Sequence, residues 1–143
     1  MIRVVDASAI GALIFGEQEK SWVQEQTDPA ELIAPLLLDF ELGNICWKKL
    51  RRFPADAELL LAAWDTWCAS TLVAMEPIDP AQTIRLARAH SLTFYDASYL
   101  WLAQHRHADV VSLDVELVRA CRNVGLHAPS PGDAGQTTPR SRN

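Results

Sequence analysis

The chain has 143 residues, 49% of them hydrophobic and 22% charged, which is typical of one globular domain and excludes a chain that is disordered throughout. Thirteen basic and eighteen acidic residues give a formal net charge of −5, which excludes a broadly basic nucleic-acid-binding coat but not a local basic groove. Three widely spaced cysteines without a CxxC pair indicate neither a disulfide framework nor a structural zinc site. No uncharged apolar run approaches the roughly 20 residues that span a bilayer, so we expect a cytoplasmic protein without membrane contact.

Strands and helices alternate along the predicted chain. Short apolar runs predict strands at residues 2–5, 32–34, 72–75 and 110–113, with a last short edge strand at 126–127. Apolar residues at helical spacing predict helices at residues 8–15, 17–26, 36–50, 56–69, 79–90, from 95 onward, and 115–122. This alternation predicts the α/β class, as a three-layer α/β/α sandwich around a mainly parallel sheet.

The C-terminal stretch differs in composition from the rest of the chain. Residues 129–143 include three prolines and two glycines and contain no large apolar side chain. Such a segment can bury little surface to offset its ordering entropy. We therefore expect one domain over residues 1–128 and a disordered tail over residues 129–143.

Four acidic residues stand at informative positions. Asp6 directly follows the first predicted strand and Asp114 directly follows the fourth, so both belong to the carboxyl edge of a parallel sheet, where ligands collect. Asp96 stands at the start of a predicted helix. Glu41 lies on an otherwise apolar helical face, and Asn44 projects from the same face three residues later.

Two interpretations of these acids remain open at this point. Asp6, Asp96 and Asp114 are each suitable helix caps or first-turn acids, and Glu41 suits a solvated helix position. If the four carboxylates instead converge in one cleft, they repel one another unless a cation lies between them. A cluster of oxygen ligands without His or Cys suits Mg²⁺ or Mn²⁺.

Four stretches that contain these acids resemble a known family. They read VVDASAI at the start, LLLDFELGNICWKKL in the third predicted helix, LTFYDASYLWLAQ before the fourth strand, and VVSLDVEL across it. In order and spacing they are similar to the PIN-domain ribonucleases, and most closely to the VapC-type toxins of bacterial toxin–antitoxin pairs. The resemblance covers about residues 1–127, and the combination of FELGN, YDASYLWLA and SLD is its most specific part.

The resemblance implies a site, an activity and partners. Asp6, Glu41, Asp96 and Asp114 would be the catalytic residues and would hold Mg²⁺ or Mn²⁺. Polar residues at Ser8, Asn44 and Ser112 would support them, Ser112 standing where many relatives have Thr. The protein would be a homodimeric endoribonuclease toxin that cleaves RNA with a metal-activated water and is silenced by a VapB-like antitoxin. Glu116 follows Asp114 closely, but its offset at the helix start is expected to point it away.

Two other functional classes compete with this interpretation. An aspartate-based phosphatase of the haloacid-dehalogenase type also places Asp after the first strand, but it needs a second Asp two residues later, where this chain has Ser8. A module that kept the fold as an interaction surface without the chemistry would not need all four acids. Binding of Mg²⁺ or Mn²⁺ separates that module from an enzyme.

Three further groups have two interpretations each. The basic cluster of Lys48, Lys49, Arg51 and Arg52 either complements the dipole of its helix or contacts RNA phosphates beside the cleft. His105 and His107 form an HxH pair that suits a solvated helix end better than a metal site. The tryptophans Trp47, Trp64 and Trp67 belong either to the core or to an apolar surface for a partner.

Overall fold

A four-stranded parallel sheet forms the centre of the protein in the computed structural model, which describes residues 1–135. The strand order is β3-β2-β1-β4, and all three pairings are parallel. The strands are β1 (Ile2–Val5), β2 (Glu31–Pro35), β3 (Val73–Glu76) and β4 (Asp109–Val111). Central Val4 pairs with Ile33 on one side and with Val110 on the other. The parallel sheet confirms the predicted α/β sandwich.

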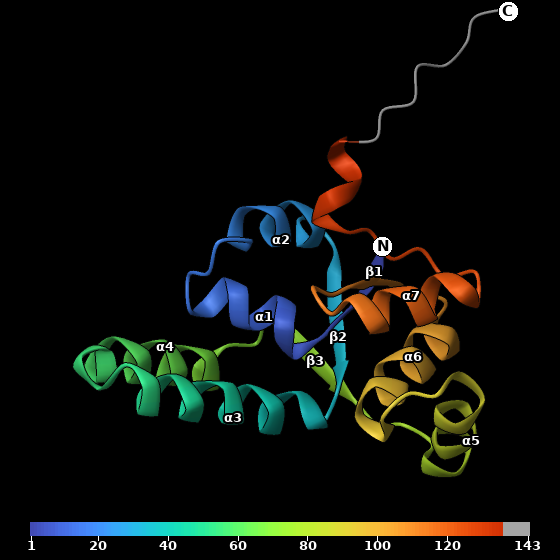
Figure 1. Cartoon of the computed structure of the whole chain (residues 1–143), viewed down its shortest axis with the longest axis horizontal. Coiled ribbons are helices and arrows are strands. Elements are labelled where there is room, and N and C mark those ends of the chain that lie inside the picture. Colours follow the sequence, from blue (N-terminus) through green and yellow to red (C-terminus); the bar gives the residue numbers. More distant parts are fainter. Residues whose placement is uncertain (136–143) are drawn as a thin grey trace, which may run out of the picture.

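Seven α-helices connect and cover the strands in the described part of the chain (Figure 1). They are α1 (Ala7–Ile14), α2 (Lys20–Thr27), α3 (Leu37–Arg52), α4 (Ala57–Ala69), α5 (Pro80–His90), α6 (Phe94–Arg106) and α7 (Val115–Asn123). Helix α6 packs across β1 and β2, and α5 packs on α6. Within residues 1–135, no helix has the length and apolar character that crossing a membrane requires.

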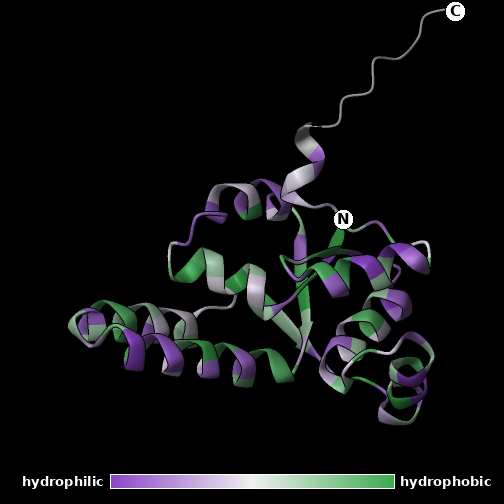
Figure 2. Cartoon of the chain, viewed as in Figure 1, coloured by the Kyte–Doolittle hydropathy of each residue, from purple (hydrophilic) through white to green (hydrophobic). Residues whose placement is uncertain are grey.

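The core lies where the strands meet α6. Val4, Val5, Val110 and Val111 are fully buried, as expected for parallel strands that are covered on both faces. Hydrophobic residues accordingly dominate the strands, whereas the surrounding helices alternate between hydrophobic and hydrophilic residues (Figure 2). This rigid centre fixes the carboxyl ends of β1 and β4 side by side.

Helices α3 and α4 form a hairpin that projects from the rest of the molecule (Figure 1). Gly43 permits their close approach, because a Cβ atom there would lie 3.3 Å from the Trp64 ring. Buried Trp67 donates a hydrogen bond through Nε1 to Asp39 Oδ1 at 2.9 Å. Trp47 remains 56% exposed. Trp64 and Trp67 therefore pack inside the hairpin, as the core interpretation predicts. Trp47 faces solvent, as the partner-surface interpretation predicts.

The C-terminal region lacks the predicted edge strand. Residues 126–127 do not form a strand; the Val110 amide donates one backbone hydrogen bond to the His127 carbonyl at 3.0 Å, and no ladder follows. Residues Pro131–Gly135 form a 3₁₀ turn, and the Arg122 guanidinium pairs with Asp133 at 2.8 Å. The part of the expected tail at 136–143 lies outside the described residues.

Candidate active site

Asp6 occupies the carboxyl end of β1 and is 6% exposed. It caps α1, because its Oδ1 accepts a hydrogen bond from the Ala9 amide at 3.0 Å. The same Oδ1 accepts from Ser8 Oγ at 2.7 Å, and Oδ2 accepts from Ser112 Oγ at 2.6 Å. Capping and a role in the site are thus compatible, and the hydrogen bonds fix the carboxylate in one orientation.

The two serines connect segments that are about a hundred residues apart in sequence. Ser8 Oγ accepts a hydrogen bond from the Leu113 amide at 2.9 Å, and Ser112 Oγ accepts from the Asp114 amide at 2.9 Å. The loop after β4 is therefore joined to the start of α1. Both serines lie where the sequence analysis expected supporting residues, in direct contact with Asp6.

Asp114 begins α7 at the carboxyl end of β4. Its Oδ1 accepts hydrogen bonds from the amides of Glu116 and Leu117 at 2.9 and 3.4 Å. These capping bonds involve one carboxylate oxygen. The expectation that Asp114 is a helix cap is confirmed, and its position beside Asp6 is the one that a parallel sheet dictates.

Glu41 reaches the same region from α3. It is partly buried, and the phenol of Tyr99 donates a hydrogen bond to Glu41 Oε1 at 2.7 Å. Tyr99 lies on α6 and is 1% exposed, so its hydroxyl has been placed against Glu41 by the core. The sequence analysis gave Tyr99 no role in the site. The available signal was its position three residues after Asp96, on the same side of α6.

Asp96 lies in the first turn of α6 but does not cap it. The helix begins at Phe94, and its cap is Thr93, whose Oγ1 accepts from the Asp96 amide at 3.1 Å. The sequence analysis placed the helix start one residue late, because the exposed Thr-Phe-Tyr segment carries no apolar periodicity. With the capping function assigned to Thr93, the carboxylate of Asp96 is not needed as a cap.

Burial and mutual repulsion raise the pKa of three of these acids. The pKa of Asp96 rises to about 6, mainly through burial and then through the charges of Asp114, Asp6 and Glu116. Burial also raises the pKa of Glu41, and the charges of Asp6, Asp96 and Asp114 add to the effect. For Asp6, burial raises the pKa against the opposing hydrogen bonds from Ser112 and Ser8. The four carboxylates therefore share one electrostatic environment.

Glu116 also contributes to this electrostatic environment. Its charge raises the pKa of Asp96, although Glu116 is exposed at the start of α7. For Asn44, which the resemblance gives as a supporting residue, the finding is different. It is exposed on α3, and within residues 1–135 no hydrogen bond joins its side chain to the carboxylates.

The acids have no cationic partner in the described part of the chain. Its ion pairs are Lys49–Glu17, Arg106–Glu76 and Arg122–Asp133, and none includes the four acids. Over the same residues, no three His, Cys, Asp or Glu side chains are arranged closely enough to hold a metal ion. The site is thus a group of repelling oxygen donors without a closed ligand shell, and its all-oxygen donor set fits a hard divalent cation.

Comparisons with known proteins agree with this geometry. The PIN domain family matches residues 3–123. Ribonuclease VapC3 of Pyrobaculum aerophilum is 30% identical over 122 residues, covering 82% of this chain and 92% of that protein. Exonuclease VapC9 of the same organism is 31% identical over 116 residues, covering 80% of this chain and 82% of that protein.

Solved structures agree as well. The crystal structure of PAE2754 from Pyrobaculum aerophilum has a TM-score of 0.69 at 28% identity and covers 90% of this chain and 83% of its own. VapC20 of Mycobacterium tuberculosis, a toxin that cleaves the sarcin–ricin loop, shares the fold with a TM-score of 0.60 at 16% identity, covering 87% of this chain and 95% of its own. From the sheet, the carboxylates at its edge and the match over residues 3–123, this chain belongs to the PIN domain family.

Proposed function

We propose that this protein is a Mg²⁺- or Mn²⁺-dependent endoribonuclease and the toxin of a VapBC-type toxin–antitoxin pair. One observation carries the proposal: the charges of Asp6, Glu41, Asp96 and Asp114 act on one another, and within residues 1–135 no Lys or Arg forms an ion pair with them. The similarity to proteins named as VapC ribonucleases supports RNA as the substrate. Its expected place of action is the cytoplasm.

In this proposal the protein's own residues fix the positions of negative charge. Ser8 and Ser112 orient Asp6, and Tyr99 orients Glu41. Together with Asp96 and Asp114 these acids would hold the divalent cation, which when bound lowers the pKa of water and offsets charge on the phosphoryl oxygens. Hydrolysis by water leaves a 5′-phosphate and a 3′-hydroxyl. It needs neither a nucleophilic side chain nor the 2′-hydroxyl.

The partners follow from the same site and from the α3–α4 hairpin. A VapB-like antitoxin would place a basic side chain among the carboxylates, because in the described part of the chain no Lys or Arg pairs with them. Exposed apolar side chains on the hairpin, Trp47, Leu59 and Leu61, would be covered by a second copy of the chain or by the antitoxin. We propose a homodimer, which light scattering at micromolar concentration tests directly; a monodisperse monomer contradicts it.

A covalently closed circular RNA tests the activity. An endonuclease opens the circle, whereas an exonuclease, the activity in the name of VapC9, has no end from which to start. We expect linear products with 5′-phosphate ends in Mn²⁺ and an intact circle in EDTA. An intact circle in Mn²⁺, combined with degradation of a linear RNA, would replace the endonuclease by an exonuclease.

A thermal melt separates the enzyme from a catalytically silent module of the same fold. Because a cation between the carboxylates binds the folded state and relieves repulsion, Mn²⁺ should raise the melting temperature. A melting temperature that is the same in Mn²⁺ and EDTA, together with no cleavage of either RNA, would favour the silent module.

A further inference from the structure

Two basic side chains follow Glu41 along one face of α3. Lys48 and Arg52 lie seven and eleven residues after Glu41, so at 3.6 residues per turn all three fall within about 20° of one line along the helix. The rise of 1.5 Å per residue places them about 10 and 16 Å from Glu41 along the axis. The helix therefore carries the acid of the site at one end of a stripe and positive charge further along it.

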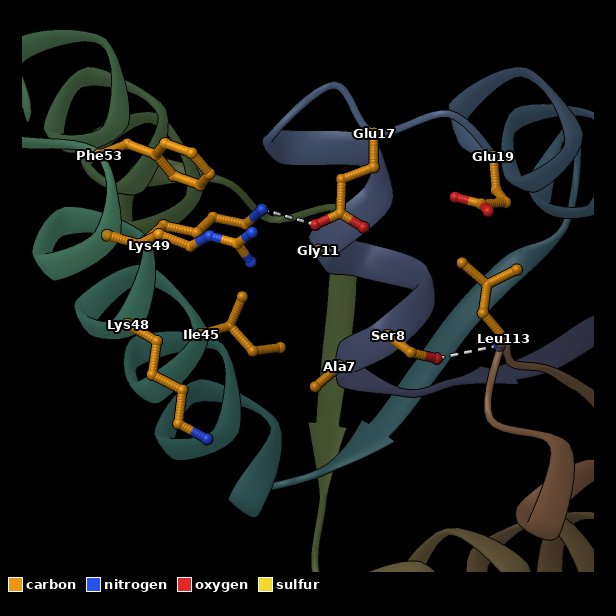
Figure 3. Close-up of a pocket in the computed structure, with 11 residues that line it drawn as sticks. Ala7, Ser8, Gly11, Glu17, Glu19, Ile45, Lys48, Lys49, Phe53 and Leu113 are labelled. Atoms are coloured by element: carbon orange, nitrogen blue, oxygen red, sulfur yellow. Dashed lines mark hydrogen bonds and ion pairs between the residues drawn. The ribbon is translucent and has the colours of Figure 1, made fainter. Parts of the chain in front are cut away.

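A cavity lies beside these two basic side chains. It has a volume of about 490 Å³, lies between α1 and α3, and is lined by Lys48 on the α3 side (Figure 3). Arg52 lines it as well. Ser8 and Leu113 line it on the other side, and the Leu113 amide donates to Ser8 Oγ at 2.9 Å. Ser8 also donates to Asp6, so one residue that lines the cavity directly contacts the proposed reaction site.

The charges that line the cavity leave Lys48 and Arg52 available for a ligand. Lys49 is paired with Glu17, its Nζ lying 2.8 Å from Oε1. Glu19 also lines the cavity and is the remaining acid there. Within residues 1–135, no ion pair includes Lys48 or Arg52.

An aromatic ring accompanies these cations. Phe53 lines the cavity and is 44% exposed, and the Arg52 guanidinium carbon lies 5.1 Å from the centroid of its ring. Proteins that bind single-stranded nucleic acid combine cations for the backbone with aromatic rings on which bases stack. An acidic protein segment would use the two cations but would have no need of an exposed ring.

We infer that this cavity is a subsite for single-stranded RNA beside the reaction site. Lys48 and Arg52 contact backbone phosphates, and Phe53 stacks on a base. This inference rests on the proposed function, since it places the reacting phosphate near Glu41. It assigns the basic residues, which the sequence analysis left open, to two roles: Lys48 and Arg52 contact RNA, whereas Lys49 is paired with Glu17.

Salt dependence of RNA binding tests the subsite. The full-length chain is titrated into a fluorescein-labelled 12-nucleotide single-stranded RNA in EDTA, which prevents cleavage, at several NaCl concentrations. For single strands, each phosphate contact contributes about 0.7 to the slope of log K against log salt. The double variant Lys48→Gln, Arg52→Gln should lower that slope by about 1.4. Phe53→Leu should weaken binding by roughly 5- to 150-fold without changing the slope.

A matched control removes the same charge outside the cavity. Lys20 and Arg51 are exposed and do not line it, so Lys20→Gln, Arg51→Gln should leave the slope near its wild-type value. Equal slopes for the two double variants would overturn the subsite. The subsite would also be overturned if a decaglutamate peptide bound the wild type and not the cavity variant while the RNA slope stayed unchanged, since the cavity would then serve an acidic protein.

The circular-RNA assay keeps the two proposals separable. If the wild type fails to cleave in Mn²⁺ but the cavity variant still lowers the slope, the nuclease proposal fails and the RNA subsite stands. If the wild type cleaves and the slopes are equal, the nuclease stands and the subsite fails.

Discussion

At the carboxyl edge of the sheet, polar side chains are partly or fully buried, and their hydrogen-bonding groups are joined to one another. Asp6 accepts from two serines and Glu41 accepts from Tyr99. On the α3–α4 hairpin the arrangement is reversed, because large apolar side chains such as Trp47 and Leu59 are exposed, at 56% and 74%. At the sheet edge, hydrogen bonds hold the carboxylates in one orientation, whereas the hairpin exposes apolar side chains to solvent.

The two regions should therefore respond differently to substitution. At the sheet edge, hydrogen bonds hold carboxylates in place against their own repulsion, so loss of one charge or one donor should change metal binding and catalysis more than folding. On the hairpin, removal of exposed apolar surface should change association with partners and leave the isolated chain nearly unaffected. Helix α3 belongs to both regions.

The largest expected effect is that of Asp96→Asn. Loss of one charge at the site should lower the rate of RNA cleavage in Mn²⁺ by about two to three orders of magnitude, while the fold persists because Thr93 caps α6. Asp79→Asn is the matched control, since Asp79 caps α5 and Asn caps about as well as Asp. Undiminished cleavage by folded Asp96→Asn would remove this residue from the site.

Tyr99→Phe tests whether the hydrogen bond from Tyr99 holds the Glu41 carboxylate in the orientation that metal binding requires. Removal of the hydroxyl that donates to Glu41 should raise the Mn²⁺ concentration for half-maximal cleavage by about 10- to 100-fold. Tyr95→Phe is the control, because Tyr95 is 61% exposed. If both variants need the same Mn²⁺ concentration as the wild type, Tyr99 is a core residue without a positioning role.

The raised pKa of Asp96 makes metal-free stability depend on pH. The folded-state value of about 6 lies above the ordinary 3.8, so the folded protein binds the proton more tightly than the unfolded chain. The resulting contribution to stability is fully present below about pH 4 and is lost as the pH rises through 6. In EDTA, Asp96→Asn should therefore be more stable than the wild type at pH 7, and this advantage should shrink by pH 4.5.

Urea unfolding of both proteins at these two pH values, in EDTA, measures that difference. Mn²⁺ at pH 7 should reverse the order, because the wild type binds the cation more tightly. If Asp96→Asn raises the free energy of unfolding by the same amount at both pH values, repulsion among the carboxylates does not destabilise the folded state.

The smallest effect is expected on the hairpin. Leu59→Ser should change the free energy of unfolding by less than about 0.5 kcal/mol, because the side chain is 74% exposed. Leu42→Ala on α3 is the contrast, since Leu42 is fully buried and its truncation should cost about 2–5 kcal/mol. Urea unfolding at low protein concentration measures both. A large loss for Leu59→Ser would show that the hairpin surface is already covered, as in a stable dimer.

Most of the fold could be predicted because its signals are local. The apolar runs that precede Asp6 and Asp114 are buried parallel strands, and strand direction alone brings those two acids to one edge. Glu41 and Asp96 were noticed from their positions on predicted helices, and the resemblance supplied their expected role in the site. The prediction of an edge strand at 126–127 was wrong, because this short segment forms one backbone hydrogen bond with β4 and no ladder.

What the sequence analysis missed depends on contacts between distant elements. The hydrogen bond from Tyr99 to Glu41 joins α6 to α3, and nothing local to either helix predicts that a buried phenol meets that carboxylate. The effect of Glu116 on the pKa of Asp96 likewise arises where α7 meets α6. Sequence pattern locates donors and acceptors, whereas pairing between helices is decided by packing.

The hydrogen bonds from Ser8 and Ser112 to Asp6 have a consequence for how the protein is made. They join the first turn of α1 to the segment after β4, so the site forms only when β4 has paired with β1. Such long-range contacts form late, after the closure of a long loop. A chain still being synthesised, with Ser112 and Asp114 inside the ribosome, has neither the support for Asp6 nor its full set of carboxylates. The site is therefore incomplete until the segment that carries Ser112 and Asp114 has left the ribosome and β4 has paired with β1.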